Sequence, residues 1–132
     1  MSYLLDTNSW IRFLNRRSEA VRRRLEALRP EEVAICSVVK AELFYGAAKS
    51  ARPVENLARI RSLDRFVSLP FDDAAAQHYG AIRARLERAG KVIGPNDLLI
   101  AAIALAHQAT LVTHNTREFG RIEELRLEDW ES

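Results

Sequence analysis

The sequence predicts an α/β protein, a three-layer α/β/α sandwich with a central, mainly parallel sheet of four to five strands. Short apolar runs alternate along the chain with segments whose apolar residues recur at helical spacing. Such alternation is typical of a parallel sheet covered by helices on both faces. The 132 residues, 48% of them hydrophobic, are enough to build one core. We therefore expect residues 1–132 to form a single domain.

The N-terminal segment is expected to form a buried strand followed by two helices. An apolar run at residues 3–5 ends at Asp6, and polar capping residues after such a run indicate that the strand leads into a helix. Apolar residues at helical spacing over positions 10–14 indicate that helix. Ser18 is a suitable N-cap for the second helix, which Pro30 ends.

The middle of the chain is expected to contain two strands and two helices. Residues 33–36 are apolar and indicate the second strand, and Ser37 is the expected cap of a helix that continues to position 47. A further helix is predicted over about residues 53–63. The third strand is expected at residues 66–69, directly before a proline.

The C-terminal part is expected to contain two long helices and two strands. The first helix is predicted over about residues 72–89, and the second over about residues 94–108. Positions 98–106 are apolar nearly all round, so this helix should be buried between other elements. The fourth strand is predicted at residues 109–113, and a fifth, short edge strand at residues 125–127.

Composition excludes several classes of protein. A single cysteine, Cys36, excludes an internal disulfide framework, and its apolar surroundings predict a small buried side chain. The longest apolar run has nine residues, about half a membrane span, so we expect a soluble, cytoplasmic protein without a membrane segment. The net charge is +2, yet residues 1–30 carry seven Arg and three acids. That cluster suits phosphate contacts, although a solvated helical face would look the same.

Three acidic residues lie in apolar surroundings. Asp6 follows a strand, Glu42 lies in a largely apolar helix, and Asp97 opens the most apolar helix of the chain. A buried carboxylate is costly unless it is paired, hydrogen-bonded or bound to a metal. Each has a structural alternative: Asp6 and Asp97 as helix-capping acids, Glu42 as the partner of Lys49 or an Arg.

The predicted topology brings these acids together. Asp6 and Asn115 follow strands that a parallel fold places near each other, and ligands bind at the carboxyl ends of such strands. Asp97 and Glu42 lie near the starts of helices that border the same edge. Several carboxylate oxygens in one cleft without Cys or His describe a site for Mg²⁺ or Mn²⁺.

Four segments carry a family resemblance. In order along the chain they are residues 4–8 (LLDTN), 41–47 (AELFYGA), 95–102 (PNDLLIAA) and 112–119 (VTHNTREF). Together they resemble the motifs of PIN-domain ribonucleases, and among these the VapC toxins of bacterial and archaeal toxin–antitoxin pairs. The resemblance implies an α/β/α sandwich, an Mg²⁺- or Mn²⁺-dependent endonuclease acting on RNA, and inhibition by a small VapB-like antitoxin. It also suggests a homodimer.

The resemblance assigns roles to individual residues. Asp6, Glu42 and Asp97 match three acidic positions of the family, and the fourth position, often Asp, is Asn115 here, with Glu118 three residues on. We expect Asp6 and Asp97 to bind the cation directly. Glu42 would complete the acidic cluster and help to place or deprotonate the attacking water.

Further residues are expected around this site. Thr7, Asn8 and Ser37 would support the ligands. His114 is a candidate RNA contact. Glu118 is expected to face outward, because the neighbouring Phe119 is the natural core residue of that turn.

An apolar groove on the N-terminal helices is expected to bind the antitoxin. Trp10, Phe13 and Leu14, with apolar residues of the helix around positions 54–63, would form a groove for an antitoxin helix. Two alternatives remain open: a non-catalytic RNA-binding module with a PIN-like fold, and an RNA-processing nuclease without an antitoxin.

Overall fold

The computed structural model describes residues 2–131 and contains a five-stranded sheet in which every neighbouring pair is parallel. The predicted mainly parallel sheet is thereby confirmed. The strand order is β3-β2-β1-β4-β5. The strands are β1 (Tyr3–Leu5), β2 (Val33–Cys36), β3 (Val67–Leu69), β4 (Thr110–Val112) and β5 (Leu127–Glu128).

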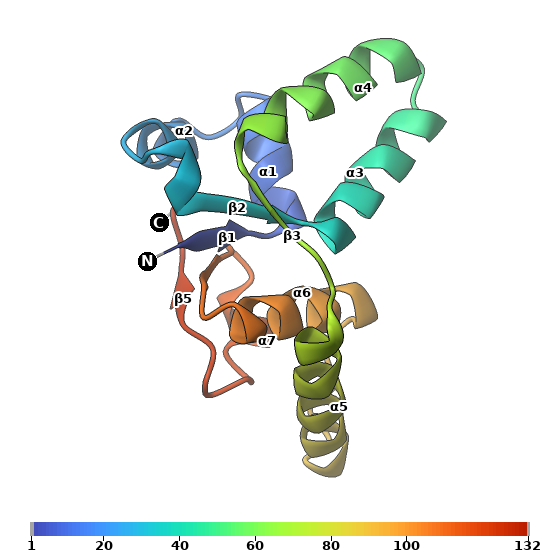
Figure 1. Ribbon diagram of the computed structural model, residues 1–132, viewed down its shortest axis with the longest axis vertical. Helices are drawn as coiled ribbons and strands as arrows, with labels where there is room; N and C mark the ends of the chain where they lie inside the picture. Colours follow the sequence, from blue (N-terminus) through green and yellow to red (C-terminus); the bar gives the residue numbers. More distant parts are fainter. Residues whose placement is uncertain (1, 132) are drawn as a thin grey trace.

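Helices cover both faces of the sheet, which confirms the three-layer architecture (Figure 1). One face carries α1 (Thr7–Leu14), α2 (Glu19–Glu26), α3 (Ser37–Lys49) and α4 (Pro53–Arg61), and the other carries α5 (Asp73–Arg88), α6 (Pro95–Ala106) and α7 (Thr116–Phe119). Short 3₁₀ turns at Pro30–Glu32 and Ser62–Arg65 precede β2 and β3. No helix in this described part of the chain is long and apolar enough to cross a membrane.

The element boundaries differ from the prediction in three places. Cys36, not Ser37, is the N-cap of α3, and the Ser37 hydroxyl donates instead to the backbone oxygen of Leu69 at 3.5 Å. The helix expected to reach residue 63 ends at Arg61, where the chain tightens into a 3₁₀ turn. The last strand lies at Leu127–Glu128, slightly beyond the predicted position, because its register is set by pairing with β4.

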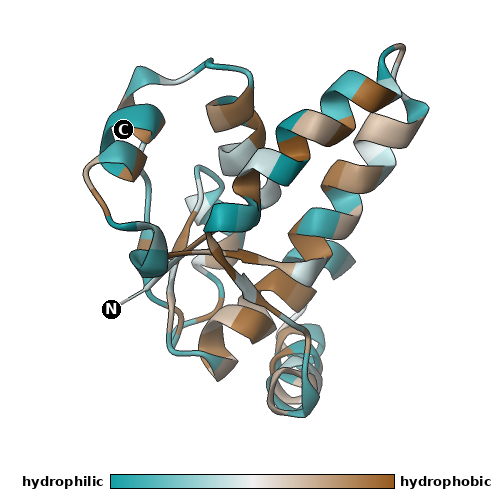
Figure 2. Ribbon diagram, turned by 45° about the horizontal axis from the view of Figure 1, so that its top comes forward, coloured by the Kyte–Doolittle hydropathy of each residue, from teal (hydrophilic) through white to brown (hydrophobic). Residues whose placement is uncertain are grey.

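The core lies between the sheet and its two helical layers. The side chains of Leu4, Ile35 and Leu111 on the three central strands are fully buried, and so is Trp10 on α1. Figure 2 colours the central strands mostly as hydrophobic, whereas the helices around them alternate between hydrophobic and hydrophilic residues. Burial also raises the pKa of the Cys36 thiol, so this cysteine is the buried apolar side chain that the sequence predicts.

The strand order places a binding site between β1 and β4. The chain adds β2 and β3 on one side of β1 and then returns to add β4 and β5 on the other side. Open parallel sheets bind ligands where the order reverses in this way, at the carboxyl ends of the strands. Leu5 pairs with Val112 in the register, and the Asp6 amide donates to the Val112 oxygen at 3.0 Å. Asp6 and Thr113 therefore emerge side by side at this point.

Candidate metal centre

Asp6 is held rigidly at the end of β1. Its side chain is the N-cap of α1, where Oδ1 accepts a hydrogen bond from the Ser9 amide at 2.9 Å. Oδ2 accepts a second hydrogen bond from the Thr113 hydroxyl at 2.6 Å, and the residue is only 5% exposed. Asp6 can therefore cap α1 and also contact a cation, because each carboxylate oxygen has a further lone pair.

Thr113 is a site residue that the sequence analysis did not single out. Its side chain is fully buried, and its hydroxyl oxygen also accepts from the Asn115 amide at 3.0 Å. One hydroxyl therefore connects the ends of β1 and β4. The sequence feature that could have identified it is its position at the carboxyl end of the fourth predicted strand.

We expect Thr113→Val to weaken the site and the fold together. Valine has nearly the same shape but removes the hydrogen bond to a buried carboxylate, which should lower the free energy of unfolding by about 1–3 kcal/mol. Because Asp6 loses this hydrogen bond, the affinity for divalent cations should also fall by about 10–100-fold. Chemical denaturation and calorimetry measure the two effects. Thr116→Val, at an exposed position of α7, is the matched control and should change neither.

Glu42 reaches the same edge of the sheet from α3. Its Oε1 accepts a 2.6 Å hydrogen bond from the Thr7 hydroxyl, so Thr7 lies where a supporting residue was predicted. Lys49, the alternative partner of Glu42, lies instead with its Nζ 4.6 Å from the centre of the Tyr45 ring. Asn8 is exposed on the cleft described below.

Asp97 lies in the first turn of α6, half-buried beside the loop that ends at Gly94. Burial, followed by the negative charges of Asp6, Glu118 and Glu42 in that order, raises its pKa to about 6. This carboxylate therefore lies close enough to three others to be repelled by each of them. The convergence of Asp6, Glu42 and Asp97 was expected from the sequence.

Glu118 turns toward this group, and the expectation that it faces outward was wrong. Its carboxylate is half-buried and accepts a 2.7 Å hydrogen bond from the side-chain amide of Asn115. It also acts electrostatically on Asp97. Phe119 is fully buried, as predicted, but in the short α7 helix the preceding residue can still point toward the end of β4. Glu118 thus lies with the three predicted acids, and the side-chain amide of Asn115 is its hydrogen-bond donor.

The donor set fits a divalent cation. Four carboxylates lie near enough to one another for three of them to raise the pKa of the fourth, Asp97. Carboxylate oxygen is the ligand type that Mg²⁺ and Mn²⁺ prefer, and a bound cation would relieve the repulsion between these groups. Asp6, fixed by two hydrogen bonds, would be the most rigid ligand.

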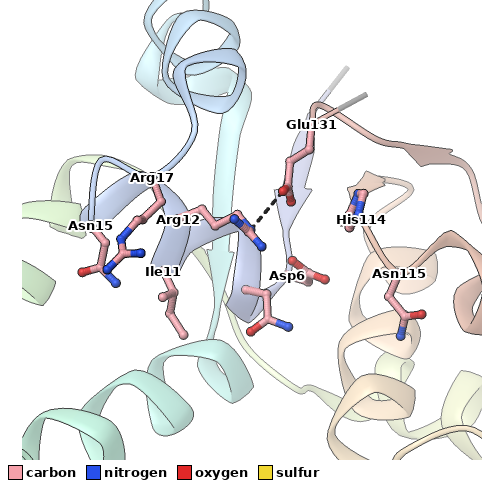
Figure 3. A pocket seen from close by; sticks show the side chains of 9 residues that line it. Asp6, Ile11, Arg12, Asn15, Arg17, His114, Asn115 and Glu131 are labelled. Atoms are coloured by element: carbon pink, nitrogen blue, oxygen red, sulfur yellow. Dashed lines mark ion pairs between the residues drawn. The ribbon is translucent and has the colours of Figure 1, made fainter.

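An open cleft of about 560 Å³ borders the acidic group (Figure 3). Its lining brings together Asp6, residues of α1, the turn after β4 and the C-terminal segment. The residues that line it are Asp6, Asn8, Ile11, Arg12, Asn15, Arg17, His114, Asn115 and Glu131. His114 was expected near this site from the sequence, whereas Arg12 and Glu131 were not.

Comparison with known proteins identifies the family. The family model described as the PIN domain matches residues 3–125. The chain is 44% identical to the tRNA(fMet)-specific endonuclease VapC of Shigella flexneri, over 98% of each chain. It is 41% identical to Ribonuclease VapC2 of Rickettsia felis, over 99% of each. Among solved structures, VapBC2 of Rickettsia felis bound to a DNA fragment from its promoter superposes with a TM-score of 0.92, covering 98% of this chain and 99% of that one.

The parallel sheet, the acidic group at its reversal point and the family match define the class: this chain belongs to the PIN-domain family. Within the family it falls among the VapC ribonucleases, with which it shares its full length. Its activity class is accordingly that of an endoribonuclease of a toxin–antitoxin pair.

Proposed function

We propose that Asp6 and Asp97 bind Mg²⁺ or Mn²⁺ directly, and that the protein uses this site to hydrolyse phosphodiester bonds in RNA. The observation that carries the proposal is the raised pKa of Asp97, which arises from burial beside three further carboxylates. A purely structural acid would be paired with a cation or a donor. The bound metal supplies positive charge that stabilises the transition-state phosphate and the leaving oxygen.

The protein's own residues position the reactants. Glu42, anchored on one oxygen by Thr7, orients the attacking water and accepts its proton. The water oxygen bonds to phosphorus while the bond from phosphorus to the leaving oxygen breaks. Thr113 keeps Asp6 in one orientation, and Glu118, held by Asn115, completes the negative charge that attracts the cation.

We further propose that the substrate is a structured RNA of the tRNA type, because a relative of 44% identity is named a tRNA(fMet)-specific endonuclease. The test is incubation of the purified protein with an initiator-tRNA transcript, in Mg²⁺, in Mn²⁺ and in chelator, followed by mapping of the cut ends. Cleavage at a defined position only with metal is expected. RNA binding without cleavage under any condition would favour the non-catalytic binding module instead.

The partner that this chain needs as a toxin is a small VapB-like antitoxin. Of the residues expected to form its groove, Phe13 and Leu14 line a surface hollow with Ala58 of α4, whereas Trp10 is fully buried and forms no part of the surface. A second hollow, of about 320 Å³, lies between α1, α3 and α4. Its apolar lining is Ile11, Leu14, Leu43, Ala47 and Ile60, and Glu42 lies on its wall as well. We propose that an amphipathic antitoxin helix binds here and places a basic side chain near the acidic group.

Antitoxin binding should therefore protect a defined set of amides. We expect hydrogen exchange in α1 and α4 to slow by about tenfold or more when a co-purified antitoxin is bound, while α5 on the opposite face stays unchanged. The substitution Leu14→Glu should weaken the complex, because it puts a charge into the apolar hollow. Protection confined to α5 would refute the groove.

The assembly and location of the protein are also proposals. We propose a homodimer of single PIN domains, each formed by residues 1–132, acting in the cytoplasm where its RNA substrate is found. Analytical ultracentrifugation of the free protein tests the dimer. A processing nuclease without an antitoxin would be indicated if no neighbouring short gene encodes a binding partner.

A further inference from the structure

The cleft beside the candidate metal centre is also lined by basic side chains. Arg12 on α1 and His114 after β4 both line it, together with Asp6 (Figure 3). The side chain of Arg12 is 47% exposed and that of His114 is 62% exposed. These side chains therefore reach solvent beside a carboxylate that would otherwise repel a polyanion.

Each of these two side chains is held by an acid from the C-terminal segment. Arg12 Nε forms an ion pair with Glu131 Oε1 at 2.9 Å, and Asp129 Oδ2 lies 3.0 Å from His114 Nδ1. The two acids are the better-buried members of the pairs, with side chains 13% and 17% exposed. Each exposed side chain is thus paired with a better-buried acid.

The Arg12 contact leaves most of the guanidinium available. The contact between Arg12 and Glu131 is made by Nε, at 2.9 Å. Four of the five N–H donors of a guanidinium are carried by the two terminal nitrogens, which form the fork that recognises phosphate. An ion pair at Nε leaves this fork to contact phosphate.

We propose that Arg12 and His114 bind the RNA phosphates next to the cut, and that Glu131 and Asp129 are positioning residues for them. The inference rests on the proposed function, since RNA must occupy the cleft that borders Asp6. The C-terminal segment after β5 thereby becomes part of the substrate-binding surface.

Binding of a fluorescein-labelled initiator-tRNA transcript to the uncleaving Asp97→Asn protein tests the proposal without cleavage. Arg12→Gln should weaken binding by about tenfold and reduce the slope of log affinity against log salt by about one. His114→Ala should weaken binding by a smaller factor. Arg23→Gln is the matched control, because Arg23 lies 78% exposed on α2 outside the cleft, and it should change binding little. Equal losses for Arg12→Gln and Arg23→Gln would overturn the proposal.

The positioning role of Glu131 is tested by a double-mutant cycle. Glu131→Gln removes a negative charge, so electrostatics alone would tighten RNA binding. If Glu131 orients Arg12, the substitution should weaken binding about threefold when Arg12 is present and not when Arg12→Gln is present. In the cleaving protein the same substitution should raise KM and leave kcat unchanged. Tighter binding or additive effects would show that Glu131 competes with phosphate and would overturn the positioning role.

The two levels of inference can fail separately. If the wild type cleaves RNA and Arg12→Gln binds RNA as the wild type does, only the proposed phosphate binding by Arg12 is refuted. If RNA binding is salt-sensitive and depends on Arg12 but no metal-dependent cleavage occurs, the proposed ribonuclease function is refuted and the phosphate binding by Arg12 is supported.

Discussion

Asp97→Asn is expected to abolish RNA cleavage, by on the order of a thousandfold, because it removes a hard anionic ligand from the metal centre. The same substitution should stabilise the metal-free protein. Asp97 is half-buried beside three carboxylates, and its pKa is raised to about 6. At neutral pH Asp97 carries a negative charge that destabilises the folded state, whereas the asparagine side chain of the variant is uncharged.

The raised pKa of Asp97 makes the stability of the metal-free protein depend on pH. The folded state holds the Asp97 proton up to a pH of about 6, whereas the unfolded chain loses it near 3.8. The unfolded state therefore binds fewer protons between these values, and the metal-free wild type loses stability from this group as the pH rises through the interval. Partial exposure screens the effect, so we expect Asp97→Asn to raise the free energy of unfolding at pH 7 by about 1 kcal/mol.

Denaturant unfolding in chelator, with and without added Mg²⁺, measures both consequences. Mg²⁺ should stabilise the wild type and leave Asp97→Asn unchanged. Asp73→Asn is the matched control, because Asp73 is an exposed acid in the first turn of α5. That variant should keep its activity and lose slight stability through the helix dipole. An Asp97→Asn protein that is less stable, and whose folded fraction still cuts RNA, would show that Asp97 is a helix-terminal acid only.

Glu118→Gln is expected to lower cleavage and cation affinity by about 10–100-fold. Its carboxylate is half-buried and accepts a hydrogen bond from the side-chain amide of Asn115, and its negative charge raises the pKa of Asp97. The amide keeps the shape of the side chain and removes only its charge. Calorimetric titration with Mn²⁺ and initial cleavage rates measure the two losses.

Two further variants define the fourth position. Glu123→Gln makes the same change at an exposed site of the same segment and should leave cation affinity unchanged. Asn115→Asp should tighten cation binding without RNA, because it adds a carboxylate beside Glu118. If Glu118→Gln binds Mn²⁺ as the wild type does, then Glu118 serves only to anchor Asn115.

The sequence by itself determined the architecture and most of the acidic group. Alternation of apolar runs and helical periodicity predicted five strands within a few residues of their observed places. Asp6, Glu42 and Asp97 were recognisable because a carboxylate in an apolar segment needs a specific reason to be there. The carboxyl-end rule for parallel sheets then placed them, with Asn115, at one edge.

Local sequence could not determine the orientation of Glu118. A buried Phe119 predicted that the preceding side chain would face solvent. In the structure the turn after β4 instead closes into the short helix α7, and Asn115 donates to Glu118 across it. The direction of a side chain in so short a helix depends on its hydrogen-bond partner, which periodicity does not describe.

Only the tertiary structure decided the contacts between distant parts of the chain. Thr113 supports Asp6 across 107 positions of sequence, and Glu131 holds Arg12 from the other end of the chain. Both contacts follow from the parallel pairing of β1 with β4 and of β4 with β5. Sequence patterns indicate on which face of its own helix or strand a residue lies. The partners described here depend instead on which strands become neighbours when the sheet assembles.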